Sequence, residues 1–247
     1  MASDKPTVLL IHGFPLDSRM WKRQVDALSG DFMVLAPDLD GHGNAPRGAP
    51  LRTVDDIASS IADRLTTATV DRVHVAGFSM GGYVALAFLR LFPDRVISLA
   101  LVDSRANADN DAGRAGRDEM AAKIREQGSG VAAAAMLPRM FTDAVADSAR
   151  RETERWMLAQ PREALVADLE AMRDRPDATP MLADIRIPVL VIVGDQDPIT
   201  PPADSQAMAA AIPGARLVTI TGASHLAPVE QPDQVNRALR DFLTTGA

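Results

Sequence analysis

The chain has 247 residues, of which 47% are hydrophobic and 24% are charged, and its formal net charge is −7. This length fits one compact catalytic domain with room for an insertion, and the composition is that of an ordinary soluble globular protein. No basic stripe of the kind found in nucleic-acid-binding proteins is visible. Because the chain contains no cysteine, disulfides, thiolate metal sites and cysteine nucleophiles are excluded.

The start of the chain and its longest apolar runs indicate where the protein works. Residues Met1–Pro6 are polar and lack the apolar stretch of a signal peptide. The longest apolar runs, such as Val189–Val193, are far shorter than the ~20 residues of a membrane-spanning helix. We therefore expect a cytoplasmic protein that binds neither membranes nor nucleic acid. The sequence does not indicate its oligomeric state.

Six short runs rich in Val, Leu and Ile predict buried strands that are apolar on both faces, as in parallel sheets. In chain order they are Thr7–Ile11, Met33–Ala36, Val73–Ala76, Ser98–Val102, Val189–Val193 and Arg216–Ile220. Helical patterns lie between or after them, at Val54–Leu65, Met80–Leu91, Ala203–Ala211 and Asp233–Leu243, and Gly41–Pro50 is predicted as a surface loop. Strands that alternate with helices indicate right-handed βαβ units and an α/β fold with a parallel sheet.

Residues 104–184 interrupt this alternation, because they contain no convincing strand. They are rich in Ala, Arg, Asp and Glu, with helical patterns at Gly113–Glu126, Ala144–Leu158 and Arg162–Arg173. The sequence therefore predicts an all-helical insertion at 104–184 and a core made of residues 1–103 and 185–247. The insertion leaves the sheet at the carboxyl end of a strand, where such folds bind ligands. We expect it to be a cap over an active site; the alternative is a small domain unrelated to catalysis.

The segment Gly77–Gly81 reads GFSMG and matches the G-x-S-x-G pattern. It lies between a predicted strand and a predicted helix, which is the context that a nucleophilic serine requires. The serine must sit on a very tight turn so that its hydroxyl projects above the sheet. Small flanking residues let the strand and the helix approach without Cβ clashes. These features predict Ser79 as a nucleophile.

A serine nucleophile needs an adjacent base, and the chain has four histidines. His12 and His42 precede glycines in loops after predicted strands, and His74 lies within a strand. His225 follows the last predicted strand, at the carboxyl edge of the sheet. This position favours His225 as the base and indicates a packed core histidine for His74.

The base needs a carboxylate that fixes its tautomer and stabilises the imidazolium. Asp195 and Asp197 both follow the strand Val189–Val193, and Asp103 ends the strand before the insertion. Asp197 lies further into its loop than Asp195, which is suited to bonding the loop's own N–H groups. Asp197 is therefore favoured, with Asp103 and Asp195 as alternatives. The order serine, aspartate, histidine is that of α/β-hydrolases.

The segment after the first strand, His12–Pro15, offers a place for oxyanion donors. Gly13 permits a sharp reversal of the chain, after which the backbone N–H of Phe14 could face a substrate oxygen beside the N–H of Met80. Such a pair of donors contributes roughly 3 kcal/mol per donor to transition-state stabilisation. The alternative is an ordinary turn at the end of a strand.

These motifs resemble those of the α/β-hydrolase superfamily over essentially the whole chain. They are Ile11–Pro15 (IHGFP), Ala36–Gly43 (APDLDGHG), Gly77–Gly82 (GFSMGG), Gly194–Pro198 (GDQDP) and Gly222–His225 (GASH). Within the superfamily, the chain resembles bacterial carboxylesterases, 3-oxoadipate enol-lactonases and cofactor-free perhydrolases. The resemblance implies a Ser79–Asp197–His225 triad, oxyanion N–H groups from Phe14 and Met80, and a helical lid at 104–184. Only six residues precede the first predicted strand, which leaves no room for the superfamily's N-terminal hairpin. We therefore expect a six-stranded, wholly parallel sheet.

Together these features predict a serine hydrolase that cleaves a carboxylic ester of a small substrate through an acyl-enzyme, without a metal or an organic cofactor. Enol-lactone hydrolysis, perhydrolysis and carbon–carbon bond hydrolysis use the same triad and stay open. A ligand-binding receptor on a hydrolase scaffold is the alternative of a different class. The substrate depends on a pocket between Phe14, Met80 and the lid. Four apolar residues of the lid are equally suited to line that pocket or to pack within the lid: Met136, Met140, Phe141 and Trp156.

Overall fold

The computed structural model describes residues 5–46 and 51–245, so the last four residues of the predicted loop Gly41–Pro50 and most of the polar segment Met1–Pro6 lie outside it. The strands are β1 (Thr7–Ile11), β2 (Met33–Leu35), β3 (Val73–Phe78), β4 (Val96–Val102), β5 (Val189–Gly194) and β6 (Arg216–Ile220). They form one parallel sheet in the order β2-β1-β3-β4-β5-β6. The predicted six-stranded parallel sheet of an α/β-hydrolase fold is confirmed.

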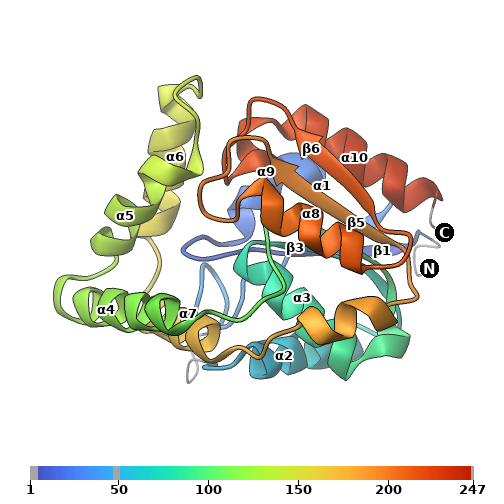
Figure 1. The fold of residues 1–247 in the computed structure, drawn as a ribbon, viewed down its shortest axis with the longest axis horizontal. Helices are drawn as coiled ribbons and strands as arrows, with labels where there is room; N and C mark the ends of the chain where they lie inside the picture. Colours follow the sequence, from blue (N-terminus) through green and yellow to red (C-terminus); the bar gives the residue numbers. More distant parts are fainter. Residues whose placement is uncertain (1–4, 47–50, 246–247) are drawn as a thin grey trace.

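Helices cover both faces of this sheet (Figure 1). On one face lie α2 (Val54–Thr67), α3 (Met80–Leu91) and α8 (Pro202–Ala211), and on the other lie α1 (Lys22–Leu28) and α10 (Pro232–Thr245). Side chains alternate along a strand, so Leu9 of β1 packs into the first layer and Leu10 into the second. Short elements complete the core: η1 (Ser18–Trp21), η2 (Pro93–Arg95), η3 (Thr179–Asp184) and α9 (Ala227–Glu230).

Four helices lie between β4 and β5, beyond one end of the sheet in Figure 1. They are α4 (Asp111–Gln127), α5 (Gly130–Met140), α6 (Asp147–Leu158) and α7 (Arg162–Asp174). The sequence patterns anticipate α4, α6 and α7 but not α5. This helix starts at Gly130 without a side-chain cap and contains Pro138, which are both signals that end a helix rather than form one. Helix α1 was not predicted either, since it is short and its first turn lacks a capping side chain.

The four apolar residues that the sequence analysis named in the insertion differ in burial. Met140 and Phe141 are buried, at 0% and 4% exposure, in a cluster that also contains Phe78 and Trp21 of the core. Met136 and Trp156 are half-buried against the same cluster. The apolar interior is therefore continuous from the sheet into the helical insertion.

Buried polar contacts also join the insertion to the loops after β1 and β2. The Nε2 atom of His42 lies 2.9 Å from Oδ2 of Asp168 on α7, and both side chains are almost fully buried. Gln160 donates to Asp17 over 2.7 Å and accepts from the backbone N–H of Gly43. Burial alone lowers the pKa of His42, but the Asp168 carboxylate raises it above its ordinary value overall. The imidazolium form of His42 therefore stabilises this junction.

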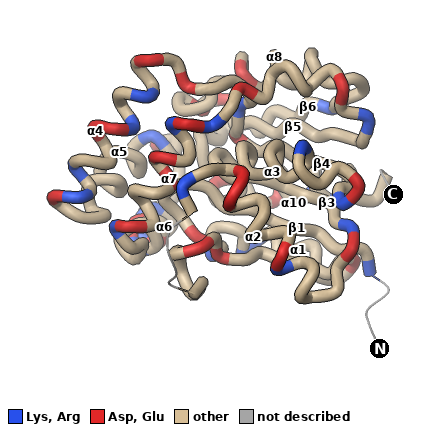
Figure 2. Tube along the Cα trace, turned by 90° about the horizontal axis from the view of Figure 1, so that it is seen from below, with Lys and Arg blue, Asp and Glu red and all other residues tan. Residues whose placement is uncertain are grey.

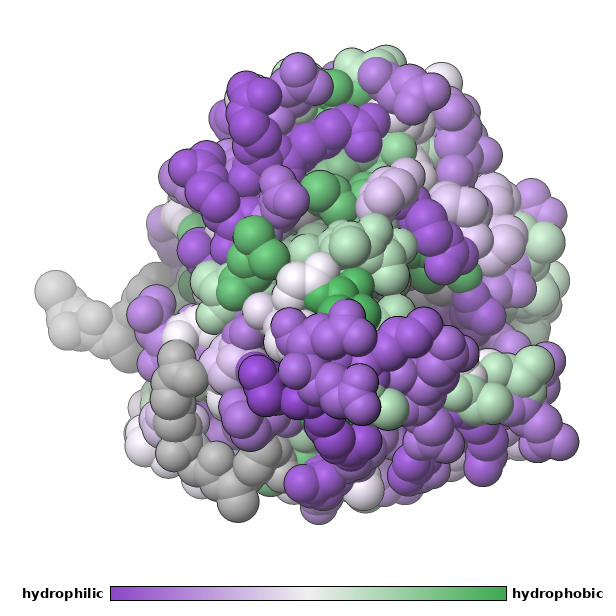
Figure 3. Space-filling model, turned by 90° about the vertical axis from the view of Figure 1, so that its left-hand side faces the viewer, coloured by the Kyte–Doolittle hydropathy of each residue, from purple (hydrophilic) through white to green (hydrophobic). Residues whose placement is uncertain are grey.

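The surface of the described chain mixes both signs of charge. Lys and Arg alternate with Asp and Glu along the trace in Figure 2. The outer side of the insertion carries an apolar band between hydrophilic areas (Figure 3), and Leu158 at the end of α6 is 48% exposed. Within residues 5–46 and 51–245, no helix combines the length and apolarity needed to cross a membrane.

We predict that Asp168→Asn makes the stability of the protein depend differently on pH. A histidine whose pKa is raised on folding contributes stability below its unfolded pKa of about 6.5, and this contribution is lost as the pH rises through the folded pKa. The variant should lose about 2 kcal/mol of unfolding free energy between about pH 5 and 6.5 and progressively less above that range. Urea unfolding of both proteins from pH 5 to 9 measures this difference. A difference that is constant across the range would contradict the ion pair.

Candidate active site

Ser79 occupies a sharp turn between β3 and α3. Its φ of 51° and ψ of −115° lie outside the regions that side chains ordinarily adopt, at a cost of about 1–3 kcal/mol. A Cβ atom on Gly77 would lie 2.2 Å from the carbonyl oxygen of Gly81, and one on Gly81 would lie 2.3 Å from that of Ile11. Glycine at both positions is therefore required for the close approach of strand and helix that presents the serine.

The structure brings Ser79, His225 and Asp197 into one hydrogen-bonded chain. Oγ of Ser79 lies 2.9 Å from Nε2 of His225, and Nδ1 of the same ring lies 2.8 Å from Oδ2 of Asp197. His225 and Asp197 are buried, and Ser79 is 8% exposed. The ring of Phe78 packs on that of His225 at a centroid distance of 5.1 Å. With Nδ1 donating to the carboxylate, Nε2 is the acceptor that faces the serine hydroxyl.

The carboxylate of Asp197 has further partners in its own loop. It accepts from the backbone N–H groups of Ile199 and Thr200 and from the Thr200 hydroxyl, at 2.7, 3.0 and 2.7 Å. Burial alone raises the pKa of Asp197, but the hydrogen bonds from His225 and Thr200 hold it below its usual value overall. Asp197 is therefore an ionised partner for an imidazolium.

The turn after β1 lies directly against the serine. A Cβ atom on Gly13 would lie 2.7 Å from the carbonyl oxygen of Phe78 and 3.1 Å from Cβ of Ser79. Within the described residues, the backbone N–H groups of Phe14 and Met80 donate no hydrogen bond. The segments that contain the two predicted oxyanion donors therefore meet at Ser79.

The other histidines and Asp195, which the sequence offered as alternatives, have hydrogen-bond partners outside the Ser79–His225–Asp197 network. His74 is buried, and its Nδ1 lies 2.8 Å from Oγ of Ser98. His12 accepts from the backbone N–H of Leu39, and burial together with the His42 charge lowers the pKa of His12 to about 4. Asp195 accepts from the backbone N–H groups of Gly222 and Ala223, which fastens the loop before His225.

Asp103 is a second buried carboxyl group close to Asp197. It is fully buried, has a φ of 44°, and accepts from the backbone N–H of Gly194 over 2.8 Å. Burial and the nearby Asp197 charge raise the pKa of Asp103 well above its usual value. The described hydrogen bonds join His225 to Asp197 and not to Asp103. A neutral Asp103 leaves a single carboxylate beside the imidazole.

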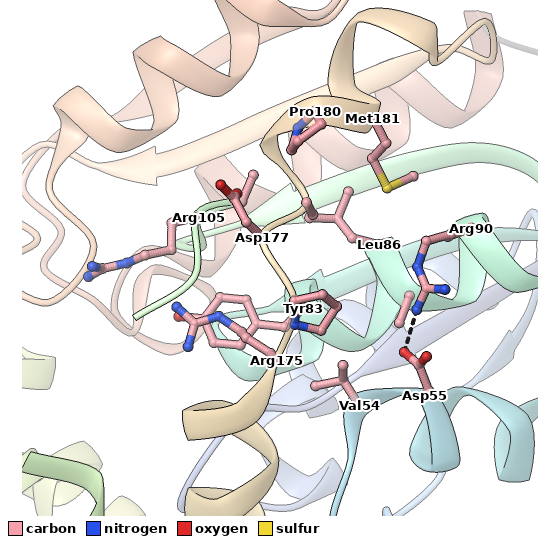
Figure 4. Close-up of a pocket in the computed structure, with 14 residues that line it drawn as sticks. Val54, Asp55, Tyr83, Leu86, Arg90, Arg105, Arg175, Asp177, Pro180 and Met181 are labelled. Atoms are coloured by element: carbon pink, nitrogen blue, oxygen red, sulfur yellow. Dashed lines mark hydrogen bonds and ion pairs between the residues drawn. The ribbon is translucent and has the colours of Figure 1, made fainter. Parts of the chain in front are cut away.

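A cavity of about 460 Å³ opens beside α3, between the two connections of the insertion to the core (Figure 4). Tyr83, Leu86 and Met181 supply apolar surface, and the Arg175 guanidinium lies 4.2 Å from the centroid of the Tyr83 ring. Arg90 in its wall pairs with Asp55. None of the residues that line this cavity is Ser79, His225 or Asp197.

Among the residues described, no cluster of three or more His, Asp or Glu side chains has the arrangement of a metal site.

The sequence analysis did not identify several residues whose hydrogen bonds fix the positions of Ser79, Asp197 and the His225 loop. The Thr200 hydroxyl lies 2.7 Å from Asp197, and Oγ of Ser104 donates to the Ser79 carbonyl over 2.9 Å. The end of α5 reaches the His225 loop, where the N–H of Leu226 donates to the Met140 carbonyl over 2.9 Å. These contacts depend on tertiary packing, so no local pattern indicates them.

Comparison with known proteins identifies the family of this chain. The model of the Alpha/beta hydrolase family matches residues 8–238. The chain belongs to this family. An esterase from Thermogutta terrifontis, solved with malate bound, superposes on this hydrolase with a TM-score of 0.94 at 36% identity, covering 97% of this chain and 90% of the other. The enol-lactonase from Burkholderia xenovorans LB400 has a TM-score of 0.88 at 31% identity, with 98% and 92% of the two chains covered. A pimeloyl-[acyl-carrier protein] methyl ester esterase from Neisseria meningitidis is 31% identical over 97% of this chain and 93% of its own.

We predict that Asp103→Asn changes how the unfolding free energy of the hydrolase depends on pH, because the pKa of Asp103 is raised in the folded protein. Below about pH 4 the carboxyl is protonated in both the folded and the unfolded protein and has no linkage effect. As the pH rises further, it ionises first in the unfolded chain, which favours unfolding of the wild type until the folded pKa is reached. The unfolding free energy of the wild type should therefore fall relative to that of the variant as the pH rises above about 4. Equal pH dependence of the two proteins in denaturant titrations would contradict a neutral Asp103.

Proposed function

We propose that this hydrolase uses Ser79 as a nucleophile to cleave a carboxylic ester of a small substrate through an acyl-enzyme intermediate. The observation that carries the proposal is the hydrogen-bonded chain from Oγ of Ser79 to Nε2 of His225, at 2.9 Å, and from Nδ1 to Asp197, at 2.8 Å. Nucleophile, base and orienting carboxylate are each within hydrogen-bond reach of the next.

The proposed reaction has two halves. In the first, His225 takes the proton from Ser79 as its oxygen attacks the ester carbonyl, and the N–H groups of Phe14 and Met80 stabilise the oxyanion. The imidazolium then protonates the departing alcohol, and an acyl ester remains on Ser79. In the second half, His225 removes a proton from water, which attacks that ester and releases the acid. The ionised Asp197 stabilises the imidazolium in both halves.

In this proposal the helical insertion covers the active site. Residues 104–184 act as a cap, because the end of α5 contacts the loop that carries His225 and α7 contacts His42 in the loop after β2. Ser79 is only 8% exposed, so a substrate is enclosed between the cap and the core. Excluding water strengthens the electrostatic contacts at the oxyanion.

Esterase activity is favoured over the other reactions of the family by the relatives. The Thermogutta esterase combines 36% identity with a TM-score of 0.94 over nearly the whole chain. Enol-lactone hydrolysis is the second candidate, because the Burkholderia enol-lactonase also covers the chain at 31% identity. A panel of p-nitrophenyl esters of increasing acyl length, together with one lactone and an assay for peracetic acid formation, separates these reactions by their kcat/KM values.

Replacing Ser79 with alanine should lower kcat/KM for p-nitrophenyl acetate and butyrate by about 10⁴-fold or more, since the variant lacks the atom that forms the acyl ester. Ser148→Ala is the matched control, because Ser148 is exposed on α6, and it should retain wild-type activity. Turnover that survives in Ser79→Ala would rule out the proposed nucleophile.

The two buried aspartates should behave differently when each is replaced by asparagine. Asp197→Asn should lower kcat by about 10⁴-fold, because the amide cannot hold the productive imidazole tautomer or stabilise the imidazolium. Asp103→Asn changes a carboxyl whose pKa is raised by burial and which bonds Gly194 rather than His225, so it should keep kcat close to the wild-type value. Steady-state kinetics at pH 7.5 measure both. The reverse ranking would make Asp103 the acid of the triad.

A further inference from the structure

The end of helix α5 is bonded to the loop that carries His225. The backbone N–H of Leu226 donates to the Met140 carbonyl over 2.9 Å, and the hydroxyl of Ser224 donates to the Arg139 carbonyl over 3.1 Å. The last carbonyls of a helix have no partner within it, and here both neighbours of His225 supply one. The position of the His225 backbone therefore depends on where α5 ends.

Glu230 completes this connection with one carboxylate. Its Oε2 accepts from the backbone N–H of Ser224 over 2.8 Å, and its Oε1 accepts from the backbone N–H of Thr142 over 2.8 Å and from the Thr142 hydroxyl. Ser224 directly precedes His225, whereas Thr142 follows α5 in the insertion. The two oxygens of one side chain thus join the histidine loop to the helical insertion.

The same end of α5 also reaches the loop of the acid. The guanidinium of Arg139 donates to the carbonyl of Pro198, which follows Asp197, over 3.1 Å. A shift of α5 therefore acts on both loops that carry the ends of the Asp197–His225 hydrogen bond. That bond is 2.8 Å long and fully buried, and geometry of this kind tolerates little displacement.

We propose that Glu230 is a positioning residue that couples the place of the helical insertion to the alignment of His225 with Ser79 and Asp197. These contacts make the alignment of the base depend on the position of the end of α5. Glu230 touches none of the reacting atoms and acts through Ser224 and Thr142. This inference rests on the proposed serine-hydrolase function, because alignment matters only if His225 is the base.

Glu230→Gln is the direct test. Glutamine keeps the size of the side chain, but its amide nitrogen cannot accept, so the N–H of either Ser224 or Thr142 loses its partner. Thr142→Val removes only the hydroxyl on the insertion side and keeps the backbone N–H. Glu170→Gln is the matched control, since Glu170 on α7 pairs with Arg52 and with Arg125, away from the His225 loop.

Three measurements on the full chain separate positioning from simple loosening. The first is the rate at which a fluorophosphonate labels Ser79, the second is kcat and KM for p-nitrophenyl butyrate, and the third is the downfield proton NMR resonance of Nδ1–H of His225. Glu230→Gln should slow labelling and lower kcat by about 10- to 100-fold with little change in KM, and should shift or broaden the resonance. Thr142→Val should give a smaller effect in the same direction, and Glu170→Gln should match the wild type.

Wild-type labelling, kcat and resonance in Glu230→Gln would overturn the inference and leave the proposed function intact. An equal loss in Glu170→Gln would overturn it as well, since any loosening of the insertion would then suffice. A wild-type protein that is not labelled by the fluorophosphonate would instead refute the proposed function. The NMR comparison needs no turnover, so an unchanged resonance in Glu230→Gln contradicts the positioning role even in that case.

Discussion

The close approach of α3 to the ends of β1 and β3 is the constraint on which the site depends. Gly77 and Gly81 leave no room for a Cβ atom between strand, helix and the neighbouring strand end. This packing forces Ser79 into a left-handed turn whose strain of about 1–3 kcal/mol is balanced by the buried core around it. The same geometry places the N–H of Met80, which has no acceptor among the described residues, next to the serine and brings the turn at Gly13 against it. The strained turn at Ser79 and the position of the Gly13 turn are thus consequences of one steric arrangement.

Electrostatics then decide which groups around the serine carry charge. Asp197 is kept ionised by the hydrogen bonds from His225 and Thr200, whereas Asp103 is kept neutral by burial and by the Asp197 charge. On the far side of the site, Asp168 favours a charged His42, although burial opposes it. Two like-charged carboxylates beside one imidazole would compete for it, so the neutral state of Asp103 preserves a single hydrogen-bonded chain.

Local sequence patterns were sufficient to predict the sheet and to select the residues of the hydrogen-bonded chain. Strands of parallel sheets are continuous apolar runs, and the pattern around Ser79 carries its own steric logic. The sequence patterns did not predict α5, because Gly130 and Pro138 are residues that usually end a helix. This helix contacts the loop of His225. Contacts such as that between Glu230 and Thr142 join residues 88 positions apart, so only the folded chain brings them together.

The claim on which the account depends is that Ser79 forms a covalent ester with its substrate, and an acid-quenched reaction tests it most directly. The protein is mixed with excess p-nitrophenyl butyrate, quenched in acid within the first turnovers, digested and analysed by mass spectrometry. The account predicts one butyryl group on the peptide that contains Ser79, and none in a Ser79→Ala sample treated in the same way. An unmodified Ser79 peptide during active turnover, or a butyryl group on a different residue that is required for turnover, would contradict it.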